Sequence, residues 1–272
     1  MNEFSLENKV SLITGANGLI GREISDAFAS YSSNLILLDN TESLGFDNFA
    51  EKLATKYSIK VKSFHANISN ENEINNAIEE AITYFGKIDV LVNLAAIDAK
   101  FDENINELPK TAFEDFPIDL WEKSLEVNVT GTFLITQRVA KQMLKQKNGN
   151  IINVASTYSL VAPNQNLYKF SEKDEQLFKP IDYVATKSMI PNFTRYLATF
   201  YGKKGIRANT IVPHGVVTNG KVEFIENFSK FSPLGRLCKK EELRGPFVFL
   251  ASDSSSYITG STLVVDGGWT AW

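Results

Sequence analysis

The amino-acid sequence predicts an α/β protein built on a doubly wound, seven-stranded parallel sheet in a single domain. Short apolar runs alternate with longer amphipathic runs along the chain, which is the pattern of strands joined by helices. The run Asn34–Leu38 is apolar almost throughout, as expected for a parallel strand that is buried on both faces. A chain of 272 residues without an internal repeat or a linker fits one such sheet.

The seven expected strands are short apolar runs, and they span Lys9–Ile13, Asn34–Leu38, Lys60–Phe64, Ile88–Val92, Asn150–Val154, Ile206–Val212 and Thr262–Val265. The expected helices are longer amphipathic runs, and they span Leu19–Tyr31, Phe46–Tyr57, Asn70–Phe85, Asp119–Lys145, Asp182–Tyr201 and Glu241–Ala251. Acidic residues near the start of the third helix favour it, because they compensate the positive end of the helix dipole. Two polar stretches, 97–117 and 163–180, interrupt the alternation and are predicted to be insertions.

The composition excludes several classes of protein. A formal net charge of -4 gives no basic surface for nucleic acid or an anionic membrane. The chain has no run of eighteen apolar residues and begins with a polar, acidic segment, so we expect neither a transmembrane helix nor a signal peptide. Cys238 is the only cysteine, and no cluster of residues has metal-ligand spacing. We therefore expect a cytoplasmic protein that acts on a small molecule and holds no metal.

The first strand leads through a glycine-rich segment, Thr14–Gly21, into a helix. Glycines let the backbone approach a pyrophosphate, and the helix N-terminus supplies N–H donors. An acidic residue, Asp39, ends the second strand and would accept hydrogen bonds from both ribose hydroxyls of NAD. It would also repel the 2′-phosphate of NADP, and no basic residue stands at Ala16, Asn17 or Asn40 to bind that phosphate. The alternative is that Asp39 only caps a turn.

A tyrosine and a lysine, Tyr183 and Lys187, are four residues apart in a predicted helix and therefore share one face. An ammonium near the phenol favours the phenolate, and we expect it to lower the tyrosine pKa from about 10 toward neutral pH. A tyrosine and a lysine at this spacing often occur by chance, so the significance of this pair comes from its position in the chain. It follows the fifth strand, which leads into Ser156, and open α/β sheets bind ligands at the carboxyl ends of their strands.

With these motifs in order, the chain resembles the short-chain dehydrogenase/reductase family over nearly its whole length. The family's motifs are matched by Thr14, Gly15, Gly18, Gly21, Asn93–Ala96, Asn128, Ser156, Tyr183, Lys187, Pro213–Gly215, Thr218, Ile258–Gly260 and Val265–Gly268. The resemblance implies a Rossmann-type fold and an NAD-dependent oxidoreductase that interconverts a secondary alcohol and a ketone.

The resemblance also implies a role for each of four catalytic residues. Ser156 would hydrogen-bond the substrate oxygen, Tyr183 would pass the proton, and Lys187 would hold the nicotinamide ribose and tune the tyrosine. Asn128 would hold a water that relays protons to solvent. The residues implied to contact NAD are Gly15, Asn17, Gly18, Leu19, Ile20, Gly21, Asp39, Asn67, Ile68, Asn93, Ala95, Tyr183, Lys187, Pro213, Gly215, Val216 and Thr218.

Three residues depart from the family's pattern. Ala96 replaces a glycine and is expected to narrow the space near the adenine ribose. Asn67 replaces an aspartate that contacts adenine, although an amide still donates and accepts hydrogen bonds. His214 replaces the glycine after Pro213, and we expect it to pack or to lie at the surface rather than to act on the nicotinamide.

The segment between Ser156 and Tyr183 is about twice as long as the family's usual one. Its extra residues, 164–179, include five large apolar side chains, so we expect part of it to pack and to form a wall of the substrate cleft. A surface loop without ligand contact is the alternative. The last two tryptophans, Trp269 and Trp272, are expected at a subunit interface, with core or substrate-facing positions as alternatives.

Family members usually pair through the two long helices, so the resemblance implies a homotetramer or a homodimer. The two insertions and the ending of residues 266–272 resemble bacterial dehydrogenases of the flagellin-modification and surface-polysaccharide type, which suggests a sugar-like substrate. Two alternatives remain: an NAD-dependent 3-oxoacyl thioester reductase, and a non-catalytic family member that binds NAD as a regulator. The complete set of four catalytic residues argues against the regulator.

Overall fold

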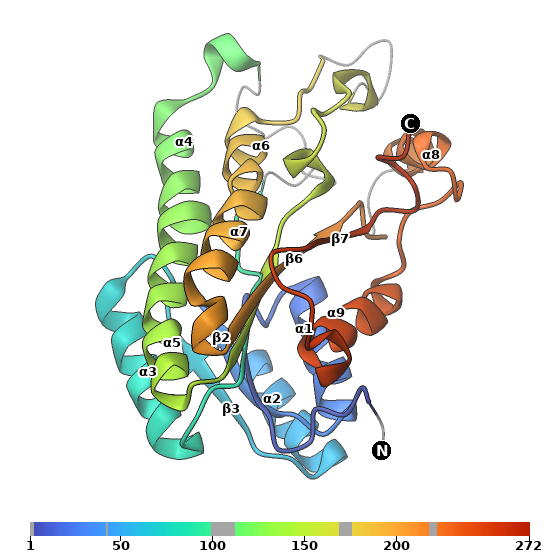
Figure 1. The fold of residues 1–272 in the computed structure, drawn as a ribbon. Helices are drawn as coiled ribbons and strands as arrows, with labels where there is room; N and C mark the ends of the chain where they lie inside the picture. Colours follow the sequence, from blue (N-terminus) through green and yellow to red (C-terminus); the bar gives the residue numbers. More distant parts are fainter. Residues whose placement is uncertain (1–2, 42, 99–111, 169–175, 218–221) are drawn as a thin grey trace.

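The computed structural model describes residues 3–41, 43–98, 112–168, 176–217 and 222–272, which form one parallel sheet between two layers of helices (Figure 1). The strands of these residues lie in the order β3-β2-β1-β4-β5-β6-β7, and every neighbouring pair is parallel. Their bounds are β1 Val10–Thr14, β2 Asn34–Asp39, β3 Val61–His65, β4 Val90–Asn93, β5 Gly149–Val154, β6 Ile206–Pro213 and β7 Thr262–Val265. The order of the strands reverses between β1 and β4, so the predicted doubly wound sheet is confirmed.

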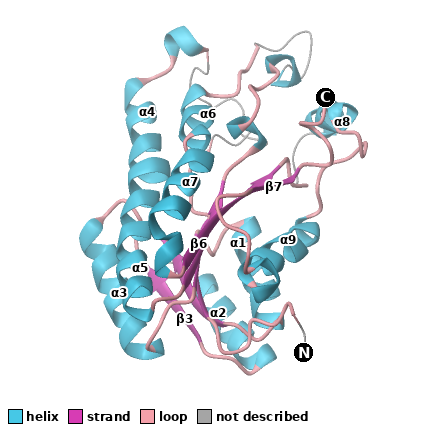
Figure 2. Ribbon diagram, in the orientation of Figure 1, coloured by secondary structure: helices cyan, strands magenta, loops and turns pink. Residues whose placement is uncertain are grey.

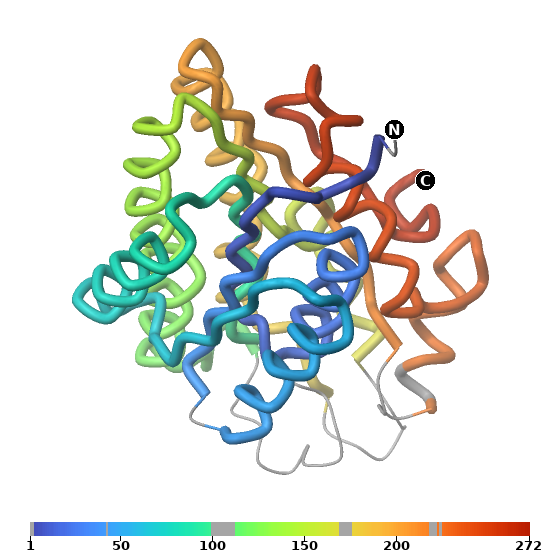
Figure 3. Tube along the Cα trace, turned by 90° about the horizontal axis from the view of Figure 1, so that it is seen from below, coloured from blue at the N-terminus to red at the C-terminus, as the bar shows by residue number. Residues whose placement is uncertain are grey.

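Helices cover both faces of the sheet (Figure 2). Their bounds are α1 Leu19–Ser30, α2 Leu44–Tyr57, α3 Glu71–Phe85, α4 Ile118–Ser124, α5 Thr132–Gln146, α6 Ile181–Ser188, α7 Ile190–Tyr201, α8 Val222–Phe231 and α9 Arg244–Ala251. Helices α1, α2 and α9 pack on one face, and α3, α5 and α7 pack on the other. In the view from below, the teal and green helices α3 and α5 lie on one side of the strands and the red helix α9 lies on the other (Figure 3).

The continuous apolar strands supply both layers of the core. On β2, Leu35 and Leu37 pack in the layer of α1 and α2, whereas Ile36 and Leu38 pack in the layer of α3 and α5. These four side chains are almost completely buried. Because successive side chains of a strand point to opposite faces, a sheet covered on both faces needs apolar residues at every position. Among the described helices, none is both long and apolar enough to cross a membrane.

The two long predicted helices are each divided. Between α4 and α5 the chain forms a π-helical segment, Leu125–Gly131, which contains Asn128. The second long helix divides at Met189 into α6 and α7, because Pro191 lies in the first turn of α7 and lacks an N–H to continue the hydrogen-bond ladder. Helix α8 was not predicted from the sequence, and its Phe228 packs against Leu167 and Tyr168.

Candidate active site

The loop between β1 and α1 is clamped onto the end of β4. The hydroxyl of Thr14 accepts hydrogen bonds from the N–H groups of Leu94, 3.1 Å away, and Ala95, 3.2 Å away. Gly15 adopts a φ of +65°, and a Cβ atom there would lie 2.8 Å from the Cα atom of Ala95. A Cβ atom at Gly21 would lie 2.1 Å from the carbonyl oxygen of Gly15. Glycine is therefore required at both positions, because no side chain fits where the loop passes so close to neighbouring backbone.

The N-terminus of α1 opens onto this cavity. Its N-cap is Gly18, which provides no side-chain cap, and its first turn contains no acidic residue. The first N–H groups of a helix have no partner within the helix, and the helix dipole makes this end positive. Gly18 and its neighbour Leu19 both line the cavity. This end of the helix is therefore suited to an anionic group such as a pyrophosphate.

Asp39 lies beside the glycine loop at the carboxyl end of β2. Its carboxylate accepts hydrogen bonds from the N–H groups of Asn17, at 2.9 Å, and Thr41, at 3.2 Å. Asp39 also lines the cavity. Both interpretations of this residue therefore describe real features: it caps a turn and presents a carboxylate to the cavity. Nearby, Arg22 hydrogen-bonds to Asn17 and to the carbonyl of Gly45, but it is not among the residues that line the cavity.

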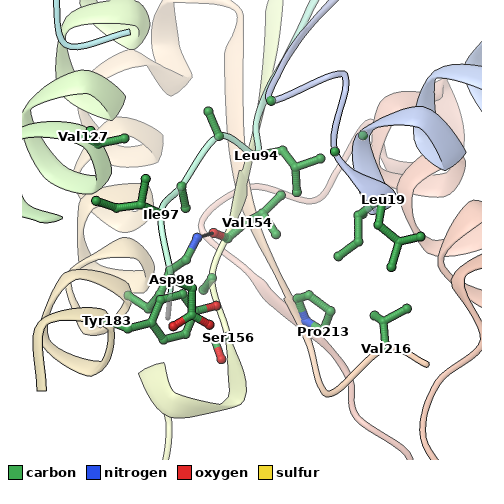
Figure 4. A pocket seen from close by; sticks show the side chains of 18 of the residues that line it. Leu19, Leu94, Ile97, Asp98, Val127, Val154, Ser156, Tyr183, Pro213 and Val216 are labelled. Atoms are coloured by element: carbon green, nitrogen blue, oxygen red, sulfur yellow. Dashed lines mark hydrogen bonds between the residues drawn. The ribbon is translucent and has the colours of Figure 1, made fainter. Parts of the chain in front are cut away.

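One cavity of about 920 Å³ connects the glycine loop with the end of β5 (Figure 4). Most residues that the sequence analysis expected to contact NAD line it, namely Gly15, Asn17, Gly18, Leu19, Ile20, Gly21, Asp39, Asn67, Ile68, Ala95, Tyr183, Lys187, Pro213, Gly215 and Val216. Thr218 lies outside the described residues. The cavity is of the size range in which proteins bind small molecules and cofactors.

The side chain of Asn93 points away from the cavity, and its expected contact with the cofactor stays a prediction. Its Nδ2 atom donates to Thr136 Oγ1 and to Asn153 Oδ1, in each case at 2.7 Å. Asn93 is 5% exposed and does not line the cavity. Its place at the end of β4 directs the side chain toward α5, so it holds strands β4 and β5 together.

Ser156, Tyr183 and Lys187 meet at the carboxyl end of β5. The Ser156 hydroxyl lies close enough to Tyr183 to lower the pKa of its phenol. The Nζ atom of Lys187 donates to the carbonyl oxygen of Val154 at 2.9 Å and lies 5.8 Å from the centre of the Tyr183 ring. All three side chains line the cavity. Helix α6 brings the tyrosine and the lysine to the same face, as their spacing predicted.

The expected lowering of the Tyr183 pKa is wrong. Burial raises the pKa of Tyr183 above 10, the negative charge of Asp98 raises it further, and the hydrogen bond from Ser156 only partly opposes them. Burial also lowers the pKa of Lys187 to about 8, against the opposing effect of Asp98. The desolvation of the phenolate therefore outweighs the nearby lysine.

Asn128 lies behind the cavity in the π-helical segment. Its Oδ1 atom accepts from the N–H of Ile97 at 2.8 Å, and its Nδ2 atom donates to the carbonyl of Ile97 at 3.0 Å and to Thr186 Oγ1 at 3.1 Å. It is 3% exposed and does not line the cavity. In this arrangement Asn128 joins the loop after β4 to helix α6, and its expected role in holding a water stays a prediction.

Both insertions contribute to the cavity. Asp98 and Lys179 line it and form an ion pair, with Nζ 2.7 Å from Oδ2. Tyr158 and Tyr168 also line it, and their hydroxyls are 2.6 Å apart. Tyr168 and Lys179 belong to the segment that was expected to form a wall of the cleft, whereas sequence reasoning assigned neither Asp98 nor Tyr158 to the site. The signal for Asp98 was its place directly after the motif at the end of β4, where ligands bind.

Known proteins resemble this chain in both sequence and structure. The sequence model of the short chain dehydrogenase family matches residues 9–227. The chain belongs to the short-chain dehydrogenase family. It is 32% identical over 270 residues to a 3-oxoacyl-acyl-carrier-protein reductase of Aquifex aeolicus. This alignment covers 98% of this chain and 99% of the relative. It is 31% identical over 274 residues to a D-threitol dehydrogenase of Mycolicibacterium smegmatis, which covers 98% and 95%.

Solved structures agree with this assignment. A gluconate 5-dehydrogenase from Burkholderia cenocepacia, in complex with NADP and tartrate, is similar with a TM-score of 0.84 and 27% identity, covering 100% of this chain and 98% of that one. A short-chain dehydrogenase from Leptospira borgpetersenii with bound NAD+ has a TM-score of 0.81 and 30% identity, covering 98% and 94%. The fold thus binds a nicotinamide cofactor, and members of the family are enzymes that act on alcohol and carbonyl groups.

In this short-chain dehydrogenase, the residues that depart from the family's pattern have defined environments. Ala96 lines the cavity. Asn67 also lines it, and its Oδ1 atom accepts from the N–H and the hydroxyl of Ser69, at 3.0 and 2.9 Å. An aspartate would accept the same two bonds, so the amide keeps this turn without the negative charge. No group of His, Cys, Asp and Glu within the described ranges is arranged to hold a metal.

His214 packs inside this short-chain dehydrogenase, as expected. Its ring stacks on Trp269 with centres 4.1 Å apart, and its Nδ1 atom is 3.0 Å from Thr157 Oγ1. Burial lowers the pKa of His214 to about 4, so the ring is neutral near neutral pH. Trp269 also stacks on Phe228, so it packs within the chain, and its expected position at a subunit interface stays a prediction. Trp272 is 79% exposed.

Proposed function

We propose that this chain catalyses the NAD(H)-dependent interconversion of a secondary alcohol and a ketone on a sugar-like substrate. The observation that carries the proposal is the meeting of Ser156, Tyr183 and Lys187 in the same cavity as the glycine loop and Asp39. A cofactor bound along the loop between β1 and α1 would thus reach a proton-transferring tyrosine.

The residues of the cavity fit NAD. The uncapped N-terminus of α1 suits the pyrophosphate, and the carboxylate of Asp39 suits the hydroxyls of the adenine ribose. Among the described residues that line the cavity there is no arginine, and the two lysines of this part of the chain, Lys179 and Lys187, lie near Tyr183. A 2′-phosphate in this place would face Asp39, so we infer a preference for NAD over NADP.

The chemistry follows from four groups of the chain. The bound nicotinamide supplies or accepts the hydride. Ser156 binds the substrate oxygen, and Tyr183 gives it a proton in reduction or takes one in oxidation. Lys187, hydrogen-bonded to Val154, binds the nicotinamide ribose and stabilises the tyrosinate that forms. Asn128 keeps the loop after β4 in register with α6.

The named relatives support a polar substrate. They include dehydrogenases of D-threitol, glucose and L-rhamnose, at 28–31% identity to this chain. The second candidate is an NAD-dependent reductase of 3-oxoacyl thioesters, because relatives with that name are 32% identical. Two polar pairs in the cavity, Asp98 with Lys179 and Tyr158 with Tyr168, favour the sugar-like substrate.

The decisive experiment is a screen that follows NADH absorbance with polyols, sugars, nucleotide sugars and 3-oxoacyl thioesters. Turnover of a hydroxylated substrate that is lost in Tyr183→Phe supports the proposal. Turnover of thioesters alone would support the second candidate. If the protein binds NADH but turns over no member of the panel, the proposed function is wrong and a non-catalytic role is favoured.

A further inference from the structure

An ion pair lies in the cavity beyond the four catalytic residues. Asp98 follows the end of β4, and Lys179 precedes the start of α6, so 81 positions separate them in sequence. The Nζ atom of Lys179 donates to both carboxylate oxygens of Asp98 and is 2.7 Å from Oδ2. Each residue belongs to one of the two insertions. Together they tie the two insertions across the cavity.

The pair lies where a substrate must bind. The Nζ atom of Lys179 is 4.2 Å from the centre of the Tyr183 ring. Asp98, Tyr183 and Lys187 line the same cavity, and the charge of Asp98 raises the pKa of both Tyr183 and Lys187. Figure 4 draws Asp98 beside Tyr183 and Ser156 at one end of the cavity. A substrate whose oxygen contacts Ser156 and Tyr183 therefore brings its neighbouring atoms to Asp98.

The two partners differ in how far they are open to the cavity. The side chain of Lys179 is 6% exposed, whereas that of Asp98 is 36% exposed. A carboxylate has about four acceptor sites, and Lys179 does not occupy all of them. The lysine therefore fixes the carboxylate, and the carboxylate faces the cavity with acceptor sites that a ligand can use. Because the two charges offset each other, the pair offers no net positive charge to an anionic substrate.

We propose that Asp98, held by Lys179, determines substrate specificity by accepting a hydrogen bond from a hydroxyl next to the reacting carbon, so that the preferred substrates are polyols or sugars with vicinal hydroxyls. This inference rests on the proposed function, because it needs a substrate oxygen at Ser156 and Tyr183. An acyl chain in the same place would bury the acceptor sites that Lys179 does not occupy, and buried acceptor sites without a partner are costly.

The test compares two alcohols of one carbon skeleton, butane-2,3-diol and butan-2-ol, with NAD+. A site that hydrogen-bonds a substrate hydroxyl discriminates against the analogue that lacks it, so the wild-type kcat/KM should favour the diol by at least ~10-fold. In Asp98→Asn and in Lys179→Gln this preference should shrink to about twofold or less. The matched control is Asp253→Asn, which breaks the Lys9–Asp253 pair near the opposite end of β1 and should keep the preference.

Three results separate this inference from the proposed function. Equal activity of the wild type on both alcohols overturns the role of Asp98, but the proposed function as an alcohol dehydrogenase still holds. Equal losses on both alcohols in both variants also overturn it, because Asp98 would then act through Tyr183 alone. If the wild type turns over neither these alcohols nor any compound of the screen, the proposed function itself fails. The Tm and the NADH affinity of each variant, compared with the wild type, show that it is folded.

Discussion

The ammonium of Lys187 donates a hydrogen bond to the carbonyl oxygen of Val154 across 2.9 Å, at the carboxyl end of β5. Lys187 is 6% exposed, and its burial lowers its pKa to about 8. The charge of this lysine therefore changes within the range in which dehydrogenases are assayed. Its contact with the strand fixes the ammonium where the nicotinamide ribose is proposed to bind.

This position predicts a pH-dependent affinity for the cofactor. Below pH 8 the ammonium is present and can donate to ribose hydroxyls, whereas above pH 8 the free enzyme loses it. The Kd for NADH should therefore rise between pH 7 and pH 9, by about tenfold at most for each pH unit above the pKa. Fluorescence titration of NADH measures it. In Lys187→Arg, which keeps its charge, the Kd should vary little over this range, and a flat wild-type profile would contradict the prediction.

Tyr183→Phe is expected to remove the proton-transferring hydroxyl and to keep the ring. Turnover should fall at least ~10²-fold, the usual contribution of general acid–base catalysis. The Kd for NADH should change little, because Lys187 and the glycine loop are unchanged. The control is Tyr196→Phe on α7, where the side chain is exposed and lies outside the cavity. Wild-type turnover in Tyr183→Phe on a verified substrate would exclude Tyr183 as the acid.

Much of the fold and part of the candidate site follow from local sequence patterns. Short runs of strand length predicted all seven strands in the described residues, and the central strands β1 and β5 are buried at every position because the sheet is covered on both faces. The spacing of Tyr183 and Lys187 predicted their common face, because it depends only on helix geometry. The glycines of the first turn were likewise predicted from the sequence. Only glycine fits at positions 15 and 21, because a Cβ atom there would collide with neighbouring backbone atoms.

The parts that escaped prediction depend on contacts between distant segments. The Asp98–Lys179 pair joins two insertions that have no periodicity, so no local pattern could reveal it. The sign of the Tyr183 pKa shift depends on burial, which the distance to a lysine does not give. The stacking of Trp269 on His214 likewise joins the end of the chain to the segment after β6, which no local pattern shows.

Asp39 is expected to control the choice of cofactor. Its carboxylate would repel the 2′-phosphate of NADP, so the wild type should bind NADH more tightly than NADPH. The double variant Asp39→Ala with Asn40→Arg should reverse or level this preference. Because Asp39 also accepts from Asn17 and Thr41, the matched control is Asp39→Asn, which keeps an acceptor and removes only the charge. Titrations with both cofactors measure the ratio, and tighter NADPH binding by the wild type would refute the assignment.

The outer faces of α5 and α7 predict self-association. Phe133, Tyr196 and Phe200 are between 46% and 60% exposed, and the last two rings stack with centres 5.6 Å apart. Such aromatic groups on neighbouring surfaces are typical of interfaces, so we expect a homotetramer or a homodimer. Light scattering at micromolar concentration measures the mass, which Phe200→Glu should reduce. The control Tyr257→Glu changes an aromatic residue that is fully exposed elsewhere. A monomeric wild type would contradict this prediction.

The segment 164–179 is predicted to form one wall of the substrate cleft, and its described ends support this role. Leu167 and Tyr168 pack with Phe228, and Tyr168 is 2% exposed. Its hydroxyl is hydrogen-bonded to that of Tyr158, and the N–H of Lys179 donates to Gln165 Oε1 at 2.8 Å. These contacts fix both ends of the segment beside the cavity.

A variant in which a short Gly-Ser turn replaces residues 165–178 keeps Lys179 and removes the wall. We expect the Kd for NADH to stay within about twofold, because the glycine loop and Asp39 are far along the cavity. The KM for the substrate should rise, or turnover should fall, by ~10-fold or more, since a closed site excludes water and positions the substrate. Tyr168→Phe removes one hydroxyl and keeps the packing, so a smaller effect is expected. Unchanged kinetics in the shortened variant would show that the segment only covers the surface.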